Sequence, residues 1–169
     1  MLRLAKAFLD IALWKQTPAH LPASALLLAL VICAEVVMEV LGALLPPGTG
    51  DAIALRIALG AGLPLAFTWA VLKAAHRRQR FLQTGIALLG VGVLAEIVLY
   101  PLGAALRIIG ADRLASVPLG FLMFVGLIWY LLACAHIWRA ALDSGLMLGG
   151  AISLGYLVLS IALEQLILP

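Results

Sequence analysis

Four charged side chains stand inside long apolar segments of the sequence, where charge is rare. Glu35 and Glu39 are one helical turn apart, Arg56 follows in the next apolar segment, and Glu96 lies in the one after that. A charged side chain at the centre of a bilayer costs about 2.5–3.5 kcal/mol on insertion scales, so something normally offsets it. The cluster predicts either a path for protons or a small solute, or a charge-paired node that packs the helices.

The spacing of these residues predicts an ion pair between Glu39 and Arg56. Glu39 lies about 17 residues into a helix that starts near residue 22, and Arg56 about four residues into the returning helix, so their depths nearly coincide. Consecutive helices joined by a short loop are usually neighbours. Glu96 is within reach of the pair, whereas Glu35 has no obvious cation. Arg56→Ala, which strands a carboxylate, is therefore expected to be more damaging than Glu35→Gln.

Other motifs do not indicate an enzyme. The string Gly48-Thr49-Gly50-Asp51 matches the GxGD of intramembrane aspartyl proteases, but that chemistry needs a second carboxylate sharing the site. A Pro/Gly turn explains the segment instead. His20, His76 and His136 have no HExxH spacing and do not gather the three or four ligands of a zinc site, so they predict no metal site. The sequence indicates a protein that is not an enzyme and uses no cofactor or metal.

The sequence is too apolar for a water-soluble fold. Hydrophobic residues make up 65% of its 169 residues and charged residues 11%, with a mean hydropathy of +1.18. Soluble domains are about 45–50% apolar and about 25% charged. The net charge is +3. The basic residues occur in short runs between apolar segments, which is typical of topology signals and not of a nucleic-acid-binding surface. Residues 1–169 are therefore expected to form a single membrane domain.

Hydrophobic runs of about 20 residues predict membrane-spanning helices. We expect an all-α polytopic transmembrane helical bundle with five spans, at about 22–45, 52–72, 82–106, 117–138 and 145–168. The second span has a weak point at residues 60–64, where two glycines precede Pro64. Residues 1–17 are too short and too charged to span, and they predict an amphipathic helix lying in the interface, with Phe8 and Leu9 dipping into the inner leaflet.

Lysine and arginine placement predicts the orientation. An inward N-terminus puts eight basic residues on the inner side, against two, Arg107 and Arg113, on the outer side. By the positive-inside rule the N-terminus is cytoplasmic and, with five spans, the C-terminus external, as in a multi-pass inner-membrane protein. The inner loop that holds Lys73, Arg77, Arg78 and Arg80 is a candidate site for lipid headgroups, because such basic clusters attract anionic lipid.

A row of small residues, Gly145, Gly149 and Ser153, predicts a close helix contact in the last span. The contact is either internal or with a partner, which would be another membrane protein or a second copy of the chain.

The opening pattern Phe8-Leu9-Asp10, Trp14-Lys15 and Leu21-Pro22-Ala23-Ser24, together with five short-looped spans, resembles the Yip family of Rab-interacting membrane proteins and its bacterial relatives. The resemblance implies a non-enzymatic membrane protein. The chain lacks the acidic-tyrosine-glycine cytoplasmic motif of the eukaryotic members, so no Rab partner is implied, and no functional residue is carried over.

Two functions follow from these features. The first is a non-enzymatic scaffold or accessory protein of the inner membrane that binds lipid or a membrane-protein partner. The alternative is a small carrier or proton-coupled transporter that uses Glu35, Glu39 and Glu96. A polar cavity that reaches these glutamates would favour the transporter, whereas a specific lipid or protein partner would favour the scaffold.

Overall fold

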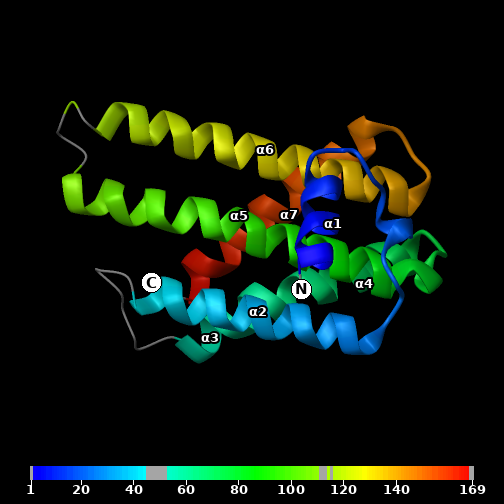
Figure 1. The fold of residues 1–169 in the computed structure, drawn as a ribbon. Helices are drawn as coiled ribbons and strands as arrows, with labels where there is room; N and C mark the ends of the chain where they lie inside the picture. The colour runs from blue at the N-terminus through cyan, green and yellow to red at the C-terminus, as the bar shows by residue number, and fades with distance from the viewer. Residues whose placement is uncertain (1, 45–52, 111–113, 115, 168–169) are drawn as a thin grey trace.

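The structure, a computed structural model, describes residues 2–44, 53–110, 114 and 116–167, and every element in this part of the chain is a helix. The predicted all-α class is confirmed (Figure 1). The α-helices are α1 (Leu2–Ala12), α2 (Ala25–Leu44), α3 (Ile53–Ile57), α4 (Leu63–Ala74), α5 (Phe81–Ile109), α6 (Ser116–Leu142) and α7 (Leu146–Ile167). Short 3₁₀ turns, η1 (Pro18–His20) and η4 (Arg78–Arg80), precede α2 and α5.

Four of these segments are long and apolar enough to cross a membrane. They are Ala25–Gly42, Arg78–Ile109, Ser116–Leu142 and Leu146–Leu166. Each falls on a predicted span. The first of these segments, α2, begins at Ala25 and not at residue 22, because Ser24 caps it. The Leu27 amide donates to Ser24 Oγ at 3.4 Å, which satisfies one of the free N–H groups of the first turn.

The predicted second span is built differently from the other four. Here α3, a π-helical segment η3 (Ala58–Gly62) and α4 follow one another without a gap, and the apolar part, Ala58–Ala74, is shorter than the four long segments. Pro64 has no N–H to donate to the carbonyl of residue 60, so the regular α pattern is interrupted at this point. The weak point seen in the sequence thus coincides with a change in helix type.

The central helix of the bundle is α5. It packs against α1, α2, α4 and α6, and α6 in turn packs against α7. In Figure 1, α2, α5 and α6 form the near layer, whereas α3, α4 and α7 lie behind them. The buried part of α5 runs from Thr84 to Ala95, so the best-packed region lies in its first half.

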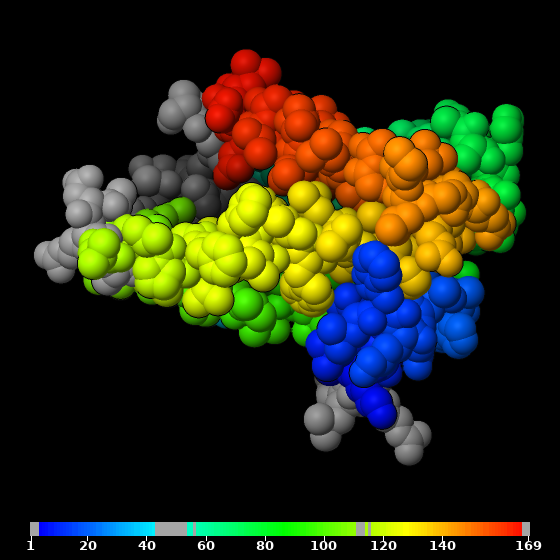
Figure 2. Space-filling model, turned by 90° about the horizontal axis from the view of Figure 1, so that it is seen from above, coloured from blue at the N-terminus to red at the C-terminus, as the bar shows by residue number. Residues whose placement is uncertain are grey.

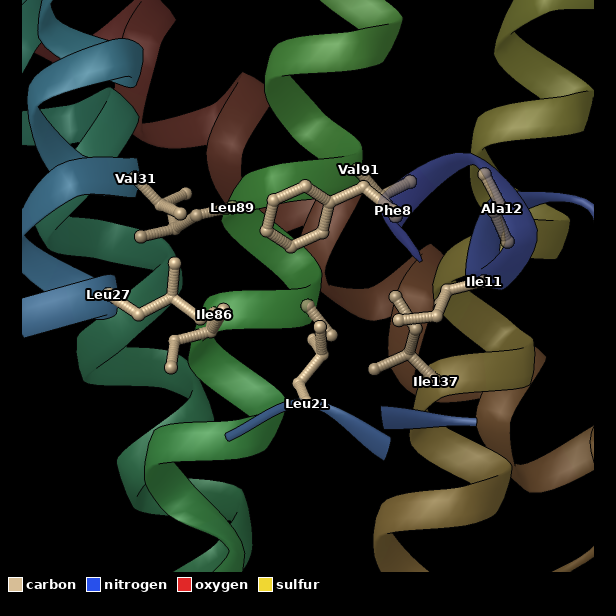
Figure 3. Close-up of a cluster of buried hydrophobic side chains, with 12 residues drawn as sticks. Phe8, Ile11, Ala12, Leu21, Leu27, Val31, Ile86, Leu89, Val91 and Ile137 are labelled. Atoms are coloured by element: carbon tan, nitrogen blue, oxygen red, sulfur yellow. The ribbon is translucent and has the colours of Figure 1, made fainter. Parts of the chain in front are cut away.

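The main core joins four α-helices and the linker after α1 (Figure 3). Its buried apolar side chains include Phe8, Ile11, Leu21, Leu27, Val31, Ile86, Leu89, Val91 and Ile137. A smaller cluster joins Leu72 of α4 to Trp138 and Ala141 of α6. Each completely buried leucine or isoleucine contributes about 1.5–3 kcal/mol relative to exposure to water, although helix contacts in lipid depend more on close packing.

The predicted lipid contact of α1 is wrong for half of its apolar face. The helix crosses α5 and α6 and buries Phe8, Ile11 and Ala12 against them, while Leu9 and Leu13 stay exposed at 45% and 46%. The reason is Gly90: without a side chain at that position, the ring of Phe8 lies directly against α5. Leu9 and Leu13 remain free to meet lipid.

Replacing Gly90 with alanine is expected to release α1, because the added Cβ would overlap the Phe8 ring. Overpacking of this kind costs about 1–3 kcal/mol. The measurement is maleimide labelling of a cysteine placed at Ile11, with Cys33 and Cys134 replaced by alanine. Labelling should be faster in the Gly90→Ala chain and unchanged by Gly120→Ala, where a Cβ would meet open space. Equal rates in both would contradict this account of α1.

The outside of the helices is apolar. Large hydrophobic side chains such as Val37, Ile97, Phe121, Met147 and Val158 are more than half exposed. A soluble protein rarely leaves such side chains uncovered along the whole length of its helices. This surface, with four helices of spanning length, is consistent with a membrane protein.

Candidate functional site

The structure brings the three predicted glutamates together near the middle of the bundle. Glu35 and Glu39 project from one face of α2, since residues four apart are neighbours on a helix, and Glu96 comes from the adjacent α5. One carboxylate oxygen from each lies within 4.8 Å of the other two. Glu35 is buried, and Glu39 and Glu96 are half-buried.

Two glycines make room for these carboxylates. A Cβ on Gly92 of α5 would lie 3.8 Å from Glu35 Oε2 and 4.0 Å from the Tyr130 hydroxyl. A Cβ on Gly60, in the π-helical segment, would lie only 2.5 Å from Glu39 Oε1. The carboxylate of Glu39 therefore rests against the backbone of η3, and π-helical turns of this kind are frequent at functional sites.

Several buried polar atoms near the cluster lack a hydrogen bond. In the part of the chain that the structure describes, Glu35 Oε2, Glu96 Oε2 and Thr68 Oγ1 have no partner. Glu35 is 5% exposed and Thr68 1%. Buried polar atoms are almost always hydrogen-bonded to protein or to ordered water. A polar or charged ligand, or water, would therefore be stabilised here.

These atoms line a cavity of about 450 Å³. It extends along α7 from Ser153 to Glu164 and along α5 from Leu88 to Arg107, following the direction in which α7 diverges from α6 (Figure 2). The three glutamates lie on its α2 and α5 walls. The cavity therefore connects the acidic cluster to a polar end, where Arg107 and Glu164 are exposed.

The predicted Glu39–Arg56 pair lies outside the described residues, because the side chain of Arg56 is among those left undescribed. The backbone of α3, which carries Arg56, packs against α2 as expected. The GxGD string at 48–51 also lies outside the described residues.

The basic inner loop is used largely within the chain. Arg77 and Arg80 both form ion pairs with Asp143, which follows α6. Arg80 Nη1 also donates to the carbonyl oxygens of Ala140 and Ala141, at 2.9 and 3.0 Å, and so caps the last turn of α6. The predicted headgroup role of Arg77 and Arg80 therefore competes with these internal acceptors.

The other two predicted headgroup residues are placed differently. Lys73 Nζ lies 4.4 Å from the ring centroid of Trp69, in a cation–π contact. Arg78 is exposed. Lys73 is exposed as well, so Lys73 and Arg78 are more open than the half-buried Arg77 and Arg80.

Asp143 gives the loop contact a pH dependence. Hydrogen bonds from Arg80 and Arg77 hold the pKa of its carboxyl below the ordinary value of 3.8. A lowered folded pKa contributes stability that is present above 3.8 and lost as the pH falls through the folded pKa. At neutral pH, Asp143→Asn is expected to lower the midpoint of thermal unfolding, and the difference should vanish in acid.

The matched control for Asp143→Asn is Arg78→Gln, which removes an exposed charge from the same turn. It should change the thermal midpoint little at any pH. A midpoint difference for Asp143→Asn that persists unchanged in acid would show that the ion pairs with Arg77 and Arg80 do not stabilise the loop.

His136 is a polar residue whose role the sequence did not reveal. Its side chain is only 6% exposed. Its ring stacks on Trp14 at a centroid distance of 5.6 Å, and Nε2 lies 3.0 Å from the Gln16 carbonyl oxygen, which can only accept. His136 joins the segment that follows α1 to α6, and the docking of α1 explains its burial.

The small-residue row forms a contact inside the chain. Gly149 packs directly on the α6 backbone at Ala135 and Arg139, and buried Ser153 donates from Oγ to the Gly149 carbonyl at 2.9 Å. Gly145 is exposed, with open space beside it. The contact between α6 and α7 thus accounts for Gly149 and Ser153 without a partner.

No protein-family model, curated protein or solved structure matches this chain. The resemblance to the Yip family therefore stays a prediction, and the function is inferred from the chain's own side chains.

Proposed function

We propose that this chain is a small proton-coupled carrier of the inner membrane, which binds a cationic solute at Glu35, Glu39 and Glu96. The observation that carries the proposal is the cavity of about 450 Å³ that reaches all three carboxylates. Such a cavity is the feature that distinguishes a transporter from a scaffold.

Electrostatics explains why a proton and a cation would compete at this cluster. Three carboxylate oxygens within 4.8 Å of one another repel strongly in a medium of low dielectric constant, so the cluster is stable only when protons or a cation neutralise part of its charge. A monocation that enters can replace one proton and leave the net charge unchanged. Exchange of this kind couples solute movement to a proton gradient.

The proposed membrane arrangement has five spans, with residues 53–74 as the second. The inner end would carry the basic loop and the α6–α7 connection, which the ion pairs of Arg77 and Arg80 with Asp143 join. Reporter fusions at residue 1 and within 73–80 should read cytoplasmic, and fusions near 48 and 169 external. A cytoplasmic C-terminus would contradict five spans.

The scaffold function receives less support from the geometry. It would use Lys73, Arg77, Arg78 and Arg80 to bind lipid headgroups, and two of these arginines already have internal partners. Two members of the small-residue row that could have served a protein partner, Gly149 and Ser153, are buried inside the chain.

The test of the carrier is cation-driven proton release from proteoliposomes that hold a pH-sensitive dye and an acidic interior. External Na⁺, Mn²⁺ and benzyltrimethylammonium are tested in turn, and at least one of them should raise the internal pH in proteoliposomes but not in empty liposomes. A Glu35→Gln/Glu96→Gln double variant should lose the response, whereas Asp10→Asn, on α1 and outside the cavity, should retain it. If folded protein releases no protons with any of these cations, the carrier proposal is wrong.

A further inference from the structure

The cavity has an aromatic wall as well as an acidic one. Phe67 of α4, Trp138 of α6 and Tyr156 of α7 all line it. The Phe67 ring lies 6.0 Å from that of Trp138, edge-on, and 5.3 Å from that of Tyr156. Aromatic rings in such arrangements bind apolar groups through their area and cations through their faces.

The size and lining of the cavity do not suit a bare metal ion. Ca²⁺ takes about six to eight oxygen ligands and Mg²⁺ about six, several of them often water. The three glutamates occupy one part of a cavity of about 450 Å³, whose remaining lining is largely apolar, including Leu63 and Leu131. Cavities of about 300–1,000 Å³ with a few fixed polar groups are typical of sites for small organic molecules.

We infer that the solute is an organic monocation with an aromatic or branched apolar body, bound with its charge at Glu35, Glu39 and Glu96 and its body among Phe67, Trp138 and Tyr156. This inference rests on the proposed carrier function and specifies its cargo. The inference is based on two features of the same cavity, the acidic cluster and the aromatic wall.

One buried atom outside the acidic cluster, which has no hydrogen-bond partner among the described residues, independently supports a ligand in this cavity. Thr68 is 1% exposed, lines the cavity next to Phe67, and has no hydrogen-bond partner for Oγ1 among the described residues. A hydroxyl that is buried without a partner is costly. A ligand that carries a polar group beside its apolar body would satisfy it.

Calorimetric titration of the purified chain in lipid nanodiscs separates charge from shape. Benzyltrimethylammonium carries both a permanent charge and an aromatic body. Tetramethylammonium has only the charge, benzyl alcohol only the ring, and Mn²⁺ is a compact divalent cation. Benzyltrimethylammonium should bind at least about tenfold more tightly than each of the other three, which corresponds to about 1.4 kcal/mol of binding free energy.

Two variants assign the two ends of the ligand. Glu35→Gln should weaken binding of benzyltrimethylammonium and of tetramethylammonium alike. Phe67→Leu should weaken only the first, because it removes aromatic area and leaves the carboxylates in place. The matched control is Phe121→Leu, an exposed phenylalanine of α6 outside the cavity, which should change neither affinity.

Proton competition gives a second readout. If one proton leaves for each cation bound, the apparent Kd should rise by up to about tenfold for each unit that the pH falls. The titratable groups that line the cavity are Glu35, Glu39, Glu96, Tyr100, Arg107, Tyr130, Cys134, Tyr156 and Glu164. Glu164→Gln tests whether the exposed end of the cavity contributes to the pH dependence of binding. If the glutamate cluster is responsible, this variant should keep the same pH dependence.

The outcomes distinguish this inference from the carrier function itself. If Mn²⁺ or tetramethylammonium binds as tightly as benzyltrimethylammonium and releases protons, the cargo class is wrong and the carrier remains. If benzyl alcohol binds as tightly as benzyltrimethylammonium, the site does not recognise charge and the inference is overturned. If none of the cations binds or releases protons, the carrier function fails as well.

Discussion

Replacing Gly60 with alanine is expected to weaken cation binding by about tenfold or more while the chain stays folded. The added Cβ would lie 2.5 Å from Glu39 Oε1 and 3.1 Å from its Cδ and Cγ, so the carboxylate must move. Because these atoms are the end of a flexible side chain, the helices need not separate. Loss of one charged partner at a desolvated site typically costs about 2–5 kcal/mol, and tenfold in affinity corresponds to about 1.4 kcal/mol.

The matched control is Gly62→Ala, two residues further along the same π-helical segment. A Cβ there meets nothing within 4 Å, so the same change of residue type should leave the affinity unaltered. Titration with benzyltrimethylammonium and with Mn²⁺ measures both variants, and thermal unfolding checks that they remain folded. Equal affinities in the two variants would mean that the position of Glu39 does not matter for binding.

Hydropathy predicted the helices well because length and apolar character decide where spanning helices can form. Predicted spans at 82–106, 117–138 and 145–168 correspond to α5, α6 and α7. The segment after Pro46-Pro47 is the exception. Its low helical regularity could be foreseen from Gly60, Gly62 and Pro64, but the π-helical geometry could not, because it depends on how η3 packs against α2.

The components of the site were visible in the sequence, whereas its shape was not. Charges inside apolar segments are expensive, so Glu35, Glu39 and Glu96 stood out from their positions alone. Phe67, Trp138 and Tyr156 carried no such signal, because isolated aromatic residues occur in any apolar helix. Only the tertiary arrangement of α4, α6 and α7 brings their rings to one cavity.

Contacts between distant segments account for what the sequence could not predict. The sequence indicated an amphipathic helix within residues 1–17, where α1 (Leu2–Ala12) forms, but periodicity cannot tell whether lipid or protein covers the apolar face. Gly90 decides this for Phe8. The headgroup site predicted at Lys73, Arg77, Arg78 and Arg80 stays a prediction, but the sequence could not show that Asp143, far along the chain, lies beside Arg77 and Arg80.

Substitution of Gly149 by alanine is expected to give the largest loss of stability of the three glycine-to-alanine changes possible in α7. Its Cβ would overlap the carbonyl oxygen of Ala135 and lie 3.1 Å from both the Ala135 carbonyl carbon and the Arg139 amide nitrogen. These are backbone atoms of a regular helix, so they cannot rotate away, and α6 and α7 must separate. Overpacking typically costs about 1–3 kcal/mol, and sometimes more.

Gly150→Ala is the matched control, one residue further along α7, where a Cβ meets nothing within 4 Å. It should be neutral or slightly stabilising, since alanine favours a helix over glycine by about 0.5–1 kcal/mol. Unfolding of both variants by SDS in mixed micelles measures the free energies. If Gly149→Ala left the free energy of unfolding unchanged but shifted the chain between monomer and dimer, Gly149 would form an interface between copies. The contact with α6 predicts the opposite result: a less stable chain whose oligomeric state does not change.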